Sequence, residues 1–241
     1  MSDSGQGAAS ESGLIGAAPS QVCCDSKWEE AYRRFQTPAE EVRKFKGRLR
    51  WAGVDAWDRD LRIAELFCGR GSGLVAWEQL GFRHLAGVDL SGQLLSEYEG
   101  PARCYVGDCR ELPLEDQSQD VVIVQGGLHH LPTIPQDLQE VLDEMNRVLK
   151  SGGKVLIFEP WKTPFLDFVR WTCNSRLARK SWYKLDALAT MIEHELETYR
   201  QWLARPAMIL DMLDARFECQ RRSIRLGMLR YAGNSRTIPS D

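Results

Sequence analysis

Acidic residues and glycines recur where short apolar runs end, a pattern typical of a ligand-binding sheet edge. The run Leu61 to Phe67 ends in the loop Cys68-Gly69-Arg70-Gly71-Ser72-Gly73, Asp89 closes the next run, and Asp108 follows a third. Glycines let a backbone approach a ligand closely, and a carboxylate after the second strand can accept both hydroxyl protons of a ribose. An acid after the third strand can accept the exocyclic amine of adenine while the N–H of Cys109 meets a ring nitrogen. The spacing predicts a nucleotide or adenosyl site.

The glycine spacing separates two ligand classes. A dinucleotide fingerprint, GxGxxG, would require glycine at position 74, where the sequence has Leu74. A nicotinamide-dependent oxidoreductase is therefore the weaker alternative.

The elements that position these residues alternate between strand and helix. Apolar runs near 61–67, 84–88, 103–106, 120–124 and 154–158 alternate with helical stretches, which is typical of βαβ units in a parallel sheet. Two further runs, 217–224 and 226–231 about Gly227, predict an antiparallel hairpin at the sheet edge. We expect a Rossmann-like α/β fold with an open, mostly parallel seven-stranded sheet flanked by helices.

The rest of the chain falls into flanking segments. Residues 1–22 are rich in Ser, Gly and Ala and predict a disordered tail, and residues 23–60 predict two helices. Thr37-Pro38-Ala39-Glu40 reads as a capping box that starts the second helix. Trp28, Tyr32 and Phe35 recur at helical spacing in the first helix, and an aromatic stripe of this kind favours core padding over a lid above a site. Within the main domain, 61–241, a connector and one helix over 161–205 predict an inserted cap after the fifth strand, and 216–232 holds the hairpin.

Five ordered motifs within residues 61–160 carry a resemblance to a known family. They are Ile63 to Gly73, Gly87-Val88-Asp89-Leu90-Ser91, Gly107-Asp108-Cys109, the stretch Asp120 to His130, and Arg147 to Gly153. The sequence resembles the class I S-adenosylmethionine-dependent methyltransferases, within the broad group that methylates small molecules and some RNAs. The first motif has Glu65 where Asp is commoner, a longer acid that the site should tolerate.

The resemblance implies a cofactor, S-adenosylmethionine, and the residues that hold it. The glycine loop would line the methionine portion, Asp89 would hold the ribose hydroxyls, Asp108 and Cys109 would frame adenine, and Gln125-Gly126 would contact the amino-acid end. The full predicted cofactor set is Glu65, Phe67, Cys68, Gly69, Gly71, Gly73, Asp89, Leu90, Asp108, Cys109, Gln125 and Gly126.

Two histidines follow the fourth strand at the mouth of the predicted cleft. Methyl transfer requires alignment of the acceptor and removal of a proton where the nucleophile carries one. The unperturbed imidazole of a histidine has a pKa suited to a base near neutrality, so His129 and His130 are the candidate catalytic residues; the alternative is that they hold the loop's shape. Glu159, Trp161 and Lys162 end the fifth strand and could face the acceptor.

Composition limits the partners. The net charge of -3 argues against a protein that coats nucleic acid, and seven cysteines without a CxxC pair predict free thiols, a cytoplasmic location and no metal site. No apolar run approaches the length of a membrane span, so we expect no membrane partner. The predicted function is methyl transfer to a small or medium-sized acceptor at oxygen or nitrogen. An RNA methyltransferase and a non-catalytic cofactor-binding protein remain alternatives. The basic, Trp-containing connector has two interpretations: a binding site for an oxyanion or RNA, or a solvated charged face.

Overall fold

The computed structural model describes residues 15–16 and 26–236. Its helices are α1 Ser26–Phe35, α2 Pro38–Trp51, α3 Ser72–Glu78, α4 Gly92–Leu95, α5 Gln136–Val148, α6 Pro164–Cys173, α7 Arg176–Ser181, α8 Tyr183–His194, α9 Leu196–Ala204 and α10 Pro206–Arg216. Its strands are β1 Ile15–Gly16, β2 Arg62–Leu66, β3 His84–Asp89, β4 Arg103–Val106, β5 Gln119–Val124, β6 Leu149–Pro160, β7 Phe217–Arg225 and β8 Met228–Ser235. The predicted tail, 1–22, lies outside the described residues apart from the backbone of β1.

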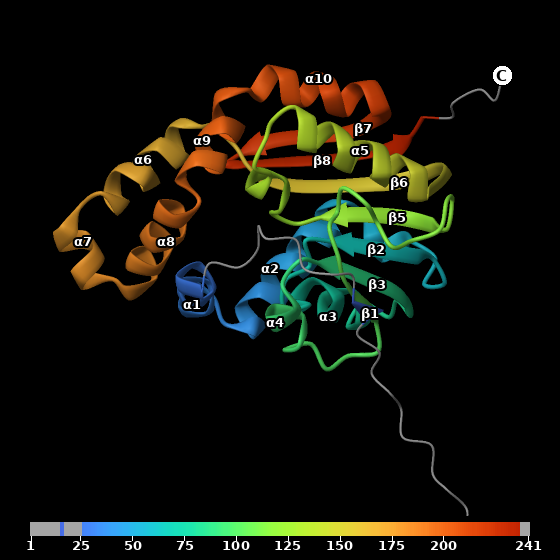
Figure 1. Cartoon of the computed structure of the whole chain (residues 1–241), viewed down its shortest axis with the longest axis horizontal. Helices are drawn as coiled ribbons and strands as arrows, with labels where there is room; N and C mark the ends of the chain where they lie inside the picture. The colour runs from blue at the N-terminus through green and yellow to red at the C-terminus, as the bar shows by residue number, and fades with distance from the viewer. Residues whose placement is uncertain (1–14, 17–25, 237–241) are drawn as a thin grey trace, which may run out of the picture.

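The strands form one open sheet in the order β1-β4-β3-β2-β5-β6-β8-β7 (Figure 1). The strands from β4 to β6 pair in parallel, β8 lies antiparallel to β6, and β7 completes the edge hairpin. The predicted Rossmann-like sheet of seven strands is confirmed, and β1 adds two residues beside β4. Strands β3 and β4 lie on one side of β2, and β5 and β6 lie on the other, so the strand order switches between β2 and β5. A ligand crevice is expected at the carboxyl ends of the two strands at such a switch point.

Both faces of the sheet are buried by helices. On one face Ala64 and Leu66 share a core with residues of α5 and α10, and on the other Ile63 packs in a core with Phe45 and Leu49 of α2. Side chains alternate along a strand. Glu65 is therefore directed to the α2 side, where it is buried.

The insert differs from the connector and single helix expected over 161–205. It contains four helices, α6 to α9, and α6 to α8 project beyond the strand ends (Figure 1). Thr163 caps α6 by accepting a hydrogen bond from the amide of Leu166 at 3.2 Å, with Pro164 in the first turn, and Ser175 caps α7. Helix α10 was not predicted. Among the described residues, no helix combines the length and apolar character needed to cross a bilayer.

Helix α2 begins as its sequence predicts. The Thr37 hydroxyl accepts from the amide of Glu40 at 3.3 Å, and the Glu40 carboxylate accepts from the amide of Thr37 at 3.0 Å. This reciprocal cap satisfies two backbone donors that a helix start otherwise leaves unpaired.

Candidate active site

Asp89 links the glycine loop to the end of β3. One carboxylate oxygen accepts from the amide of Gly69 at 2.7 Å, and the other accepts from the amide of Ser91 at 2.8 Å. Burial raises the pKa of Asp89 despite these two amide donors. Each carboxylate oxygen has a further lone pair, so the side chain is oriented and can still accept two hydroxyl protons.

The glycine loop is shaped by the protein's own side chains. Gly69 and Gly71 have φ values of 55° and 74°, in the left-handed region that favours glycine. A Cβ on Gly71 would lie 2.5 Å from the Tyr98 ring, and one on Gly73 would lie 1.9 Å from the Glu65 carboxylate. Internal packing therefore already requires glycine at positions 71 and 73, and the approach of a ligand to this loop stays a prediction.

Glu65 and Gln125 form a buried polar pair at the carboxyl ends of β2 and β5. The Gln125 side-chain amide donates to Glu65 Oε1 at 3.2 Å, whereas Glu65 Oε2 and Gln125 Oε1 are buried without a hydrogen-bond partner. Burial raises the pKa of Glu65 to about 8. Buried acceptors without donors are costly. This pair is therefore suited to a ligand group that carries N–H donors, such as an ammonium.

The ionisation of Glu65 leads to a prediction about the ligand-free protein. Because its folded pKa lies above its ordinary value of 4.5, its contribution to stability is fully present below pH 4.5 and is lost as pH rises toward about 8. Over that range the loss amounts to about 5 kcal/mol at most. We expect Glu65→Gln to flatten the pH dependence of the free energy of unfolding and to stabilise the protein most at pH 8, as measured by denaturant titration.

The same substitution at an exposed glutamate separates the effect of burial from the effect of removing one negative charge. Glu140 is exposed on α5, so Glu140→Gln should leave the pH profile unchanged. Parallel profiles for wild type and Glu65→Gln would show that Glu65 does not titrate as a buried carboxyl group.

The predicted adenine-binding pair lies at the end of β4. The Asp108 carboxylate accepts from the Arg110 guanidinium at 2.6 Å, and Arg110 also donates to Asp137 at 2.9 Å. Arg110 lowers the pKa of Asp108 against an opposing effect of burial. Cys109 is buried in the core, and burial raises its pKa, so its backbone rather than its thiol is available for recognition.

The two histidines belong to a carboxylate network. His129 Nδ1 lies 2.7 Å from the buried Glu159, whose other carboxylate oxygen accepts from the amides of Gly127 and Leu128, both at 2.8 Å. Burial alone would raise the pKa of Glu159, but His129 and these two amides lower it overall. His129 is thus fixed by Glu159.

His130 is held by a carboxylate from the insert. Its Nδ1 lies 3.1 Å from Glu195 Oε2, between α8 and α9. Burial alone would lower the pKa of His130, but Glu195, Glu159 and Asp89 together raise it above its ordinary value of 6.5. The sequence interpretation missed Glu195, which has no local motif.

Helix α1 lies over the same strand ends. The Ser91 hydroxyl donates to the buried Glu29 at 2.8 Å, and the Trp28 indole N–H donates to Glu195 at 3.0 Å. The Tyr32 hydroxyl donates to Glu41 at 2.7 Å beneath the Arg70 guanidinium, which lies 4.8 Å from the Tyr32 ring. Trp28 and Tyr32 thus make polar contacts with neighbouring elements, whereas α2 contributes Phe45 and Leu49 to the core; a lid role for α1 stays a prediction.

A metal ion is one conceivable occupant of the histidine cluster. His129, His130 and Glu195 each offer a ligand atom within 4.8 Å of the other two. Hydrogen bonding accounts for the same arrangement, because Glu159 holds His129 and Glu195 holds both His130 and Trp28. We therefore treat the cluster as a hydrogen-bonded network.

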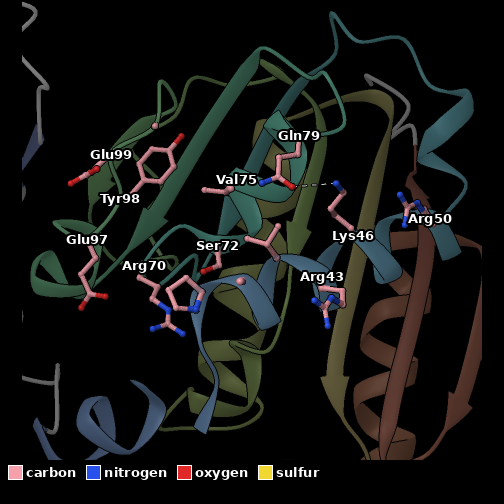
Figure 2. A pocket seen from close by; sticks show the side chains of 14 residues that line it. Arg43, Lys46, Arg50, Arg70, Ser72, Val75, Gln79, Glu97, Tyr98 and Glu99 are labelled. Atoms are coloured by element: carbon pink, nitrogen blue, oxygen red, sulfur yellow. Dashed lines mark hydrogen bonds between the residues drawn. The ribbon is translucent and has the colours of Figure 1, made fainter. Parts of the chain in front are cut away.

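A groove of about 700 Å³ lies on the outer side of the glycine loop (Figure 2). Arg43, Lys46 and Arg50 line it along α2, and Tyr98 lines its opposite side (Figure 2). The strand-end side chains Asp89, Glu65 and Gln125 do not line this groove. The groove therefore adjoins the glycine loop, through Arg70 and Ser72, but does not include these strand-end side chains of the predicted cofactor site.

Geometry and topology together define the class of protein. An open sheet with this strand order, a glycine loop after β2 and an acid at the end of β3 is the architecture of class I S-adenosylmethionine-dependent methyltransferases. Residues 64–157 match the family described as "Methyltransferase domain". This match and the fold together support a class I S-adenosylmethionine-dependent methyltransferase, with S-adenosylmethionine as its cofactor.

Individual proteins show the same relationship. A demethylmenaquinone methyltransferase of Staphylococcus aureus is 26% identical over 149 residues, 54% of this chain and 60% of that protein. A 2-phytyl-1,4-naphtoquinone methyltransferase of Synechocystis is 30% identical over 137 residues, 51% of this chain and 55% of that protein. The chain thus matches little more than half the length of these relatives.

The solved structure of the PH0226 protein from Pyrococcus horikoshii shares the fold. Its TM-score is 0.65 at 16% identity, with 88% of this chain and all of that chain covered. A putative methyltransferase from Methanococcus maripaludis has a TM-score of 0.58 at 14% identity, with 92% of this chain and 98% of that chain covered.

Proposed function

We propose that this chain transfers a methyl group from S-adenosylmethionine to a small or medium-sized acceptor bound beneath α1 and the insert. The observation that carries the proposal is the pair of unpartnered, buried acceptors on Glu65 and Gln125 beside an Asp89 already oriented by the glycine loop. They match the two ends of an adenosyl amino acid, since Asp89 can accept from ribose hydroxyls and the buried pair can accept from an ammonium. The fold alone would not settle function.

The residues around this pair complete the cofactor assignment. Asp108 and the backbone of Cys109 would read the edge of adenine, and Gln125-Gly126 would contact the amino-acid end. The bound cofactor would supply a methyl group on a sulfonium, and an acceptor atom would take this methyl group by in-line displacement with the thioether of S-adenosylhomocysteine as the leaving group. The protein therefore has to align the acceptor and exclude water.

The acceptor would meet the histidine network. His130, held by Glu195, would take a proton from an oxygen or nitrogen nucleophile, and Glu159 fixes the adjacent His129. The stacked rings of Trp28 and Tyr32, 5.2 Å apart, suit a flat acceptor. The relatives named for quinone substrates are consistent with that shape, and one such name, a C-methyltransferase, adds carbon to the possible acceptor atoms.

Calorimetric titration tests the reaction class directly. We expect S-adenosylmethionine and S-adenosylhomocysteine to bind and NAD not to bind, because position 74 is leucine rather than the third fingerprint glycine. Binding of NAD, or absence of heat from both adenosyl ligands, would contradict the proposal and favour the hydride-transfer alternative.

A further inference from the structure

Exposed large apolar side chains are concentrated at one end of the molecule. Among the described residues these side chains are 40% to 81% exposed, and all lie in the insert or at the tip of the β7–β8 hairpin. They are Phe165, Phe168, Trp171, Leu177, Trp182, Tyr183, Ile224 and Leu226. We call this set the aromatic face. Soluble surfaces rarely gather apolar side chains in this way unless they bind something.

The two parts of the aromatic face are adjacent. Gly227, at the hairpin tip, packs so closely on α6 that a Cβ there would lie 3.3 Å from Leu166 and 3.7 Å from Phe165. The amide of Trp161 donates to the Gly227 carbonyl at 2.8 Å. Along α6, the rings of Phe168 and Trp171 have centroids 6.0 Å apart. The helices that carry most of the face project away from the sheet (Figure 1).

Basic side chains accompany the aromatic face. Between residues 162 and 180 the chain has Lys162, Arg170, Arg176, Arg179 and Lys180 against a single acid, Asp167, although the whole chain has a net charge of -3. Arg179 is paired with Asp186 and Glu193. Across the part of the chain that the structure covers, the exposed Arg176, Lys180 and Arg225 form no ion pair. Exposed basic side chains are thus close neighbours in sequence of the exposed apolar ones, in the insert and at the hairpin tip.

We propose that the aromatic face docks on an anionic lipid surface. Trp, Tyr and Phe beside Lys and Arg are the side chains that bind the headgroup region, where rings insert to a shallow depth and cations meet lipid phosphates. A symmetric contact with a second copy would bring the same basic residues of both copies together. The expectation of no membrane partner rested on the absence of a spanning run, which shallow surface binding does not need.

Docking would place the cap of the site at the lipid surface. The insert that carries the aromatic face also supplies Glu195 to His130 and Tyr199 to His129, the latter with ring centroids 5.6 Å apart. Lipid binding itself requires neither cofactor nor acceptor, so it can be measured independently of the proposed methyl transfer.

Vesicle cosedimentation tests the proposal on the full chain. With vesicles of phosphatidylglycerol and phosphatidylcholine in equal parts, we expect the protein to pellet, and with phosphatidylcholine alone we expect at least tenfold weaker binding. The combined variant Phe168→Ser, Trp171→Ser, Trp182→Ser should bind the anionic vesicles at least tenfold more weakly. The pair Arg176→Glu and Lys180→Glu should produce a similar loss.

A matched charge change checks that the face is specific. Arg43→Glu with Arg50→Glu alters the same charge on α2, away from the aromatic face, and should change vesicle binding less than twofold. Equal loss in this control, or no pelleting of wild type with anionic vesicles, would overturn the proposal. A dimer in sedimentation velocity that the serine variant abolishes would also overturn it, by assigning the face to self-association. Unchanged melting temperatures would show that the exposed substitutions leave the fold intact.

Discussion

Asp89→Ala is expected to weaken the binding of S-adenosylhomocysteine by about 100-fold or more. Each hydrogen bond to an ionised group contributes about 1.5 to 3 kcal/mol, and the alanine variant would remove two such acceptors from the ribose. It would also free the amides of Gly69 and Ser91, which Asp89 now holds at 2.7 and 2.8 Å. Titration calorimetry at constant ionic strength measures the change.

Two control variants make the result specific to the ribose. Asp89→Asn retains one carbonyl acceptor and should give an intermediate loss of affinity. Asp116 is a carboxylate with 76% of its side chain exposed, so Asp116→Ala should leave the affinity unchanged. If folded Asp89→Ala protein binds like wild type, the ribose is held elsewhere and the cofactor assignment is wrong.

The sheet could be predicted from sequence because buried parallel strands are continuous apolar runs with polar ends. Strand β4 has the predicted bounds, and the observed bounds of β2, β3 and β5 differ from the predicted ones by no more than one residue. Helix α10 escaped prediction for the opposite reason. Ile209 and Leu213 are buried, but Met208, Leu210 and Met212 also pack against the core, so an apolar stripe with helical period is missing.

The site was predictable only where strand ends determine it. Asp89, Glu65 and Gln125 converge because parallel strands bring their carboxyl ends to one edge. Glu195 is separated from His130 in the chain by the four helices α5 to α8, and only tertiary packing brings it within 3.1 Å of His130. Trp28 has the helical spacing of a core residue, and its indole contact with Glu195 depends on that same packing.

The position of Glu195 leads to the second large effect, on turnover. We expect His130→Ala to lower kcat by about 100-fold or more, the usual contribution of a positioned base, with the affinity for S-adenosylhomocysteine unchanged. His130 accepts a proton only when neutral, and its raised pKa places the rising limb of the kcat profile above pH 6.5. Glu195→Gln removes the nearest of the carboxylates that stabilise the charged imidazole, so the limb should move to lower pH. Methyl-transfer rates over pH 5 to 9 measure both effects.

The direction of the pH shift distinguishes catalysis from support of the loop. If His130 only holds the loop, its substitution would lower the activity of the protein through altered binding or folding. Glu195→Gln would then leave the rising limb of the kcat profile at the same pH. Retention of full kcat by His130→Ala would remove His130 from the chemistry. Activity should also persist in the presence of a chelator, because Glu159 and Glu195 already hold both imidazoles by hydrogen bonds. Loss of activity that zinc restores would instead make His129, His130 and Glu195 ligands of a metal ion.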